Sequence, residues 1–169
     1  NGGRNGSSGF VDLSHLAIEH GRDRMLVALL EKGIDVKAVN HSGDSLVISA
    51  VKSRKGHLLN SLKEFGADFS TVDREGRSAA RLAVDLRDKN LLLELIKLGA
   101  PVDTFAADGL TPLLAAVQSF NGDLVRALVE KGAAVNLASN QEEGGIAPVS
   151  LALRQRCLPM AAFLLERGA

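Results

Sequence analysis

The feature that most constrains the fold of this chain is a glycine that returns at an almost constant interval. Five segments with similar apolar sequences end in Gly33, Gly66, Gly99, Gly132 and Gly168, at intervals of 33, 33, 33 and 36 residues. An alanine lies sixteen residues before each of these glycines, at positions 17, 50, 83, 116 and 152. Two series with the same period indicate a structural unit repeated five times.

Each unit is predicted to hold two short helices. The first helix is expected to begin at a residue whose side-chain oxygen can accept a hydrogen bond from the helix backbone, namely Asp12, Ser45, Ser78 or Thr111. Ala147 stands there in the fifth unit and offers no such cap. The second helix carries apolar residues at helical spacing, which predicts one buried stripe per unit. These residues are Met25, Leu26, Leu29, Leu58, Leu59, Leu62, Leu91, Leu92, Leu95, Leu124, Val125, Leu128, Met160, Ala161 and Leu164.

Each recurring glycine is expected to end its second helix in the left-handed conformation, at little cost. An extended stretch follows and is expected to turn at Gly43, Gly76, Gly109 and Gly145. The fifth unit is three residues longer than the others, and the extra residues fall in LASNQEEGG at 137–145. We therefore expect a longer finger in that unit, with Glu142 and Glu143 on it.

This order of helix, helix, glycine stop and finger resembles the ankyrin repeat, most closely in GLTPLLAAVQSFNGDLVRALVEKGAAVN at 109–136. The resemblance covers residues 11–169 and implies an all-α solenoid of helix-turn-helix units with β-hairpin-like fingers. We expect one domain over residues 11–169, with repeats at about 11–40, 41–73, 74–106, 107–142 and 143–169. Residues 1–10 have the composition of a flexible Gly/Ser-rich linker or an expression-vector remnant.

The family's T-P-L-H motif is only partly kept. It reads DLSH at 12–15, SLVI at 45–48, SAAR at 78–81, TPLL at 111–114 and APVS at 147–150, so that only His15 keeps the histidine. In the family, this histidine joins adjacent repeats by hydrogen bonding. Its loss in four units predicts either modest stability or apolar packing through Ile48 and Leu114 in place of that bond. No polar capping repeat is visible, and we expect the chain to be a fragment of a longer protein in which Phe163 and Leu165 face a further repeat.

No residue pattern predicts catalysis, a cofactor or a metal site. The four histidines include no pair at helix-face ligand spacing, Cys157 is the single cysteine, and no phosphate-binding glycine motif follows a predicted strand. A single cysteine favours a reducing compartment, so we expect a cytoplasmic protein, with the nucleus as an alternative. No apolar run is long enough to span a membrane. The resemblance also makes Asn136 a candidate for asparagine hydroxylation, although a turn role suffices for it.

The resemblance implies that a partner binds to the finger tips and the exposed side of the first helices. The candidate partner-binding residues are His20, Asp44, Lys52, Arg54, Lys55, Arg74, Arg77, Asp85, Leu86, Arg87, Leu110, Gln118, Ser119, Phe120 and Arg154. The loops between paired helices are basic, and the fingers lean acidic. We therefore hypothesise a positive stripe that meets an acidic segment of the partner, with ordinary solvated charge as the alternative.

Phe120 stands where the family usually has glycine. An exposed ring there is a candidate interface anchor. The expectation we favour is that it packs against Leu86 or Leu153.

Together these observations predict a protein-interaction scaffold or adaptor, and not an enzyme. The alternative is an accessory regulatory or substrate-recruiting domain of a larger enzyme or channel, whose other domains are partners within the same chain. Nucleic-acid binding is disfavoured, because 20 basic and 20 acidic residues cancel and the chain has no Trp or Tyr for base stacking.

Overall fold

The computed structural model describes residues 6–140 and 144–169, with side chains from residue 13 onward. Its helices are α1 (Gly6–Glu19), α2 (Asp23–Glu31), α3 (Leu46–Lys52), the 3-10 helix η1 (Gly56–Leu58), α4 (Leu59–Glu64), α5 (Ala79–Asp85), α6 (Lys89–Lys97), α7 (Pro112–Gln118), α8 (Gly122–Glu130), α9 (Pro148–Arg154) and α10 (Leu158–Glu166).

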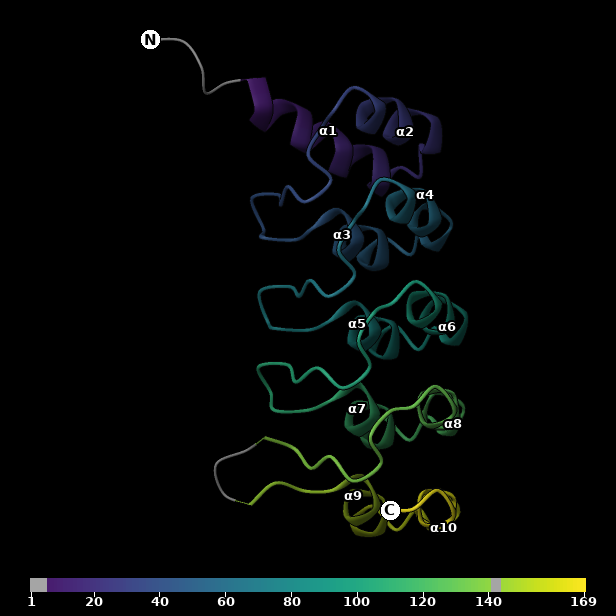
Figure 1. Ribbon diagram of the computed structural model, residues 1–169. Helices are drawn as coiled ribbons and strands as arrows, with labels where there is room; N and C mark the ends of the chain where they lie inside the picture. The colour runs from purple at the N-terminus through teal and green to yellow at the C-terminus, as the bar shows by residue number, and fades with distance from the viewer. Residues whose placement is uncertain (1–5, 141–143) are drawn as a thin grey trace.

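The helices form five antiparallel pairs stacked in chain order (Figure 1). The odd-numbered helices lie in the middle of the stack, the even-numbered helices lie along one side, and the fingers project from the other side. We call the surface formed by the fingers and the odd-numbered helices the inner face. Consecutive odd-numbered helices pack on one another from α1 to α9. The predicted all-α solenoid of helix pairs and fingers is confirmed.

Side-chain caps begin three of the odd-numbered helices. Ser45, Ser78 and Thr111 accept hydrogen bonds from the backbone of Ile48, Arg81 and Leu114, and Ala147 caps nothing, all as predicted. The prediction for the first repeat is wrong. Helix α1 begins at Gly6, so Asp12 lies inside the helix and cannot cap its start, and residues 6–10 are helical although we predicted a linker there.

The recurring glycines end the even-numbered helices with positive φ, from 80° at Gly66 to 99° at Gly99, as predicted. Gly43, Gly76 and Gly109 make the finger turns with positive φ. In the finger between α8 and α9, the residue in the left-handed conformation is Gly144 and not the predicted Gly145. A Cβ at Gly145 would overlap the Ser139 carbonyl oxygen, so Gly145 permits a close backbone approach instead. Glu142 and Glu143 lie outside the described residues.

The core lies between the two helix layers. The five recurring alanines are at most 1% exposed, since neighbouring helices meet there. The leucine stripes of α6 and α8 are buried as predicted. In α2, however, Leu26 and Leu30 are buried while Met25 is 37% exposed, because this helix has a stacked neighbour on one side only.

The last helix corrects a second expectation about burial. Leu165 is 55% exposed, but Phe163 is only 7% exposed. The guanidinium groups of Arg126 and Arg167 lie 4.7 and 5.0 Å from the centre of its ring and cover it. A cation above an aromatic ring is attracted to the face of that ring. Phe163 is therefore covered by residues of the fold itself, contrary to the expectation that it faces a further repeat.

Candidate partner-binding site

The inner face of the second to fourth repeats carries a chain of ion pairs. Lys52 Nζ lies 2.8 Å from Asp44 Oδ1 and 3.3 Å from Asp73 Oδ2. Asp73 accepts two hydrogen bonds from the Arg77 guanidinium, at 3.0 and 2.8 Å. The chain continues from Arg77 to Asp85 at 3.6 Å and ends in Arg81, which contacts Asp85 at 3.0 Å and Asp108 at 2.6 Å. Four side chains that we predicted as separate partner contacts, Asp44, Lys52, Arg77 and Asp85, therefore belong to one connected chain of ion pairs.

Asp73 is the most buried member of this chain. Its side chain is inaccessible to solvent, and its Oδ1 also accepts hydrogen bonds from the backbone N–H groups of Glu75 and Arg77. Burial acts to raise the pKa of Asp73, but the hydrogen bonds and positive charge of Arg77 outweigh it and lower the pKa to about 2. Asp73 is therefore ionised in the fold, where it orders the finger before α5 through Arg77 and joins that finger to Lys52 of α3.

Arg81 is a residue whose role the sequence reading missed. It occupies the place of the family's histidine and is only 7% exposed. Its guanidinium donates to Asp108 and to the Leu110 carbonyl oxygen on the next finger, which joins the third repeat to the fourth. Asp85 lies four residues after Arg81, a spacing that predicts an ion pair on a helix. A search for the family's histidine at this place does not detect that signal.

The other repeats are joined as predicted. His15 Nδ1 and Ser49 Oγ are hydrogen-bonded at 2.7 Å, which links the first repeat to the second. Ile48 and Leu114 are fully buried in place of the histidine. Asn136 Nδ2 donates to the Gly168 carbonyl oxygen at 2.8 Å, a structural role in the link between the last two repeats.

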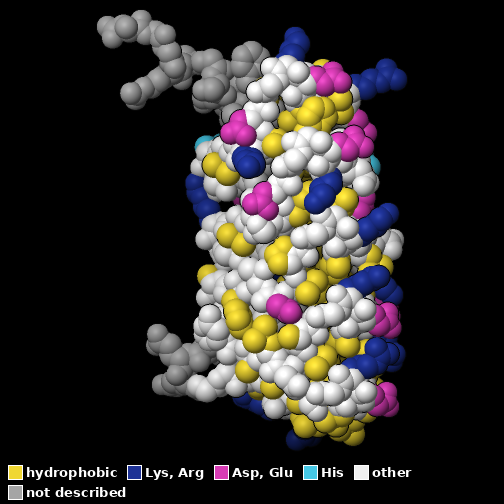
Figure 2. All heavy atoms as spheres, in the orientation of Figure 1, with side chains coloured by type: hydrophobic (Ala, Val, Ile, Leu, Met, Phe, Trp, Pro, Cys, Tyr) yellow, Lys and Arg dark blue, Asp and Glu magenta, His cyan; other side chains and the backbone are white. Residues whose placement is uncertain are grey.

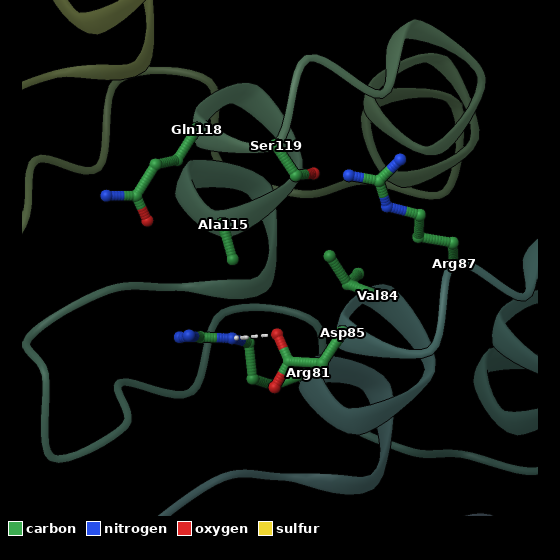
Figure 3. Close-up of a pocket in the computed structure, with 7 residues that line it drawn as sticks. All are labelled: Arg81, Val84, Asp85, Arg87, Ala115, Gln118 and Ser119. Carbon is green, nitrogen blue, oxygen red and sulfur yellow. Dashed lines mark hydrogen bonds and ion pairs between the residues drawn. The ribbon is translucent and has the colours of Figure 1, made fainter.

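A hollow of about 260 Å³ opens between α5 and α7 on the inner face. Its lining residues are Arg81, Val84, Asp85, Arg87, Ala115, Gln118 and Ser119. Figure 3 shows Arg81 and Arg87 on opposite sides of the hollow, with Val84 and Ala115 between them. Val84 and Ala115 are 2% and 6% exposed and form an apolar floor. The arrangement suits one side chain of a partner, since its walls are polar and its floor is apolar.

The loops between paired helices hold four non-glycine residues in the left-handed conformation. These are Arg54, Arg87, Phe120 and Arg156, with φ between 55° and 58°, and we call them the loop row. They occupy equivalent places in the second to fifth repeats, and Gly21 occupies that place in the first. Positive φ is uncommon outside glycine, and these four are the only non-glycine residues with positive φ in the described part of the chain.

Phe120 corrects the prediction that it packs against Leu86 or Leu153, because it is 59% exposed. The end of α9 reaches the neighbouring loop through Gln155, whose side-chain amide donates to the Gln118 carbonyl oxygen at 3.3 Å. Leu153 is itself 50% exposed. The alternative we raised for Phe120, an exposed interface anchor, therefore matches its position.

The remaining predicted residues divide by exposure. His20, Arg74, Gln118 and Arg154 are exposed, whereas Lys55, Leu86 and Ser119 are half-buried. Arg74 donates to the His41 carbonyl oxygen of the preceding finger. Leu110 is only 8% exposed, so its prediction as a contact residue is wrong: its carbonyl oxygen accepts from Ala106 N–H and Arg81, and its side chain packs inward.

The predicted positive stripe is not continuous. Lys52 is held between two aspartates, and Phe120 stands at the loop position that Arg54, Arg87 and Arg156 occupy in the second, third and fifth repeats. Figure 2 shows basic and acidic side chains intermixed along the side of the even-numbered helices. Within residues 13–140 and 144–169, no group of three metal-ligating side chains gathers. In the described part of the chain, no helix has the length and apolar character to cross a membrane.

The fold and this face define a helical repeat protein whose paired helices stack beside protruding fingers. The sequence model of the family described as ankyrin repeats, in three copies, matches residues 82–169, which is more than half of the chain. The chain therefore belongs to the ankyrin-repeat family, whose members are in general protein–protein interaction modules and typically non-catalytic. The first two helix pairs, before the matched segment, have the same arrangement. Among curated proteins no significant match is found.

Proposed function

We propose that this chain is a scaffold or adaptor module that binds a segment of another protein on its inner face, between the second and fifth repeats. The observation that carries the proposal is the hollow between α5 and α7 beside the exposed ring of Phe120. An apolar floor, polar walls and an adjacent exposed aromatic residue are the features of a binding hot spot.

The charge distribution supports a protein partner over a nucleic acid. Arg77 and Arg81 are neutralised by aspartates, so these two arginines of the inner face are not free to bind a phosphate backbone. Gln118, Ser119 and Phe120 instead offer an amide, a hydroxyl and a ring. Such mixed groups suit a peptide.

Site-specific crosslinking tests the proposal. A photo-crosslinking amino acid at Gln118, on the rim of the hollow, is expected to capture a protein from an extract of the source cells. The matched control carries the same group at Lys97, an exposed residue of α6 outside the inner face. Equal capture at both positions, or capture of nucleic acid alone at Gln118, would contradict the proposal.

The second function considered for this chain, an accessory domain within a larger enzyme or channel, uses the same face. In that case the group at Gln118 is expected to crosslink to another domain of the same polypeptide. The mass of the crosslinked product distinguishes the two.

A further inference from the structure

We propose that the loop row binds an extended segment of the partner, and that this segment carries acidic, acidic, apolar and acidic side chains, in that order, at three-residue intervals. This inference rests on the proposed function and adds the chemistry of the partner. It concerns Arg54, Arg87, Phe120 and Arg156, which lie in the loops that follow the odd-numbered helices of the second to fifth repeats.

The first argument is conformational. A left-handed backbone brings the Cβ of an L-residue too close to the following carbonyl oxygen, a penalty that glycine avoids. Gly21 shows that glycine fits this place in the same fold, with φ 61°. Four of the five repeats nevertheless carry a large side chain there. Strained backbone of this kind clusters at functional sites, which points to a role for these side chains outside the fold.

The second argument concerns charge. The guanidinium groups of Arg77 and Arg81 are bonded to carboxylates, but among the described residues no carboxylate pairs with Arg54, Arg87 or Arg156. Arg54 donates one hydrogen bond, to the Leu86 carbonyl oxygen at 3.3 Å. Asp88, beside Arg87, accepts instead from the backbone N–H of Leu91. The three arginines retain donors in the planar arrangement that binds carboxylates in pairs of hydrogen bonds.

The third argument is spacing. Packed helices lie roughly 8–10 Å apart, so equivalent residues of consecutive repeats are separated by about that distance. A partner segment in the extended polyproline II conformation advances about 3.1 Å per residue and makes one turn every three residues, so its side chains at three-residue intervals face the same side and lie about one repeat apart. A partner running along the loop row therefore places acidic residues opposite Arg54 and Arg87, an apolar residue opposite Phe120, and a third acidic residue opposite Arg156. The acidic residue at Arg87 lies at the mouth of the hollow, which Arg87 lines.

The test uses the full chain and a phage-displayed library of random peptides, each about a dozen residues long so that it spans four repeats. We expect the enriched peptides to carry the acidic, acidic, apolar, acidic pattern. Their affinity is expected to fall at least about tenfold for the double variant Arg54→Gly and Arg87→Gly, because each lost carboxylate pair removes a charge-assisted contact. Phe120→Gly is expected to abolish the preference for an apolar residue at the third position of the pattern.

The glycine variants also separate a binding role from a structural one. Since glycine suits the left-handed backbone, we expect the melting temperature to hold or to rise by up to roughly 3 °C per substitution while binding falls. Lys97→Ala removes one positive charge from α6 and is expected to leave binding unchanged.

Two results would overturn the inference: enriched peptides without the acidic spacing, or peptides that bind the double glycine variant as tightly as the original chain. If such peptides still crosslink at Gln118, the inference fails and the proposed function stands. If no peptide is enriched, the inference fails, and the crosslinking experiment judges the proposed function independently.

Discussion

The inner face of the second to fourth repeats differs in chemistry from that of the fourth and fifth, although both are built from the same backbone unit. In the first region, eight charged side chains from Asp44 to Asp108 form one network of ion pairs, in which Glu75 is an exposed branch on Arg77. In the second region, between residues 109–140 and 144–169, no ion pair is present. Neutral hydrogen bonds such as those of Gln155 and Asn136 join the repeats there instead.

This difference shows that one repeat geometry can be stabilised by alternative contacts. In the second region, Gln118, Phe120 and Leu153 are exposed. We propose that the ion pairs of the first region mainly stabilise the fold, and that the partner binds at the hollow, which Arg81 and Asp85 of that region also line, and along the loop row.

The largest expected effect comes from breaking the charged region at its most buried group. Asp73→Ala removes the acceptor of Arg77, Lys52 and two backbone N–H groups, and we expect the free energy of unfolding to fall by about 3 kcal/mol. Urea denaturation measures this loss. The control is Glu75→Gln, since the Glu75 side chain is 63% exposed and its change is expected to matter little. Equal effects of the two substitutions would show that the ion-pair chain does not stabilise the fold.

The pH dependence of stability sharpens the same comparison. The folded pKa of Asp73, about 2, lies below the value of about 3.9 expected in the unfolded chain. Ionised Asp73 therefore stabilises the fold fully above about pH 5, and this stabilisation, on the order of 2 to 3 kcal/mol, is lost as the pH falls toward 2. Urea titrations between pH 6 and about pH 2.5 are expected to show that acid lowers the free energy of unfolding less in Asp73→Asn than in the original chain. Parallel curves for the two would contradict the assignment.

A smaller effect tests the neutral region. Thr111 caps α7, and Ala147, at the equivalent place before α9, has a similar extended backbone but no side-chain cap. We expect Thr111→Ala to cost about 1 kcal/mol and Ala147→Thr to add about the same amount. A proline follows both residues, so the two variants are matched. If Ala147→Thr does not raise the free energy of unfolding, the missing cap does not lower the stability of the fifth repeat.

Most of the fold follows from the sequence because its determinants are local. The cap at Ser78, the small Ala83 and the left-handed Gly99 each act within their own repeat, and the period carries them along the chain. The predicted start of the first helix is wrong because the analogy of Asp12 with Ser45 and Ser78 does not hold. The residues before Asp12 are already helical.

The candidate site was less predictable because its determinants lie between repeats. Arg81 and Asp108 are 27 positions apart in sequence, and only the stacked fold brings them to 2.6 Å. Likewise, the exposure of Phe120 depends on how α9 meets the loop between α7 and α8. The recurrence of large residues at the place of Gly21 was visible in the sequence, but its left-handed backbone was not.

Hydrogen exchange with and without the most strongly enriched peptide tests the central claim most directly. If the partner binds along the inner face and loop row, backbone exchange is expected to slow in the loops at 53–56, 86–89 and 119–122 and in α5 and α7. The even-numbered helices are expected to exchange at unchanged rates. Slowing confined to α4, α6, α8 or α10 would contradict the account.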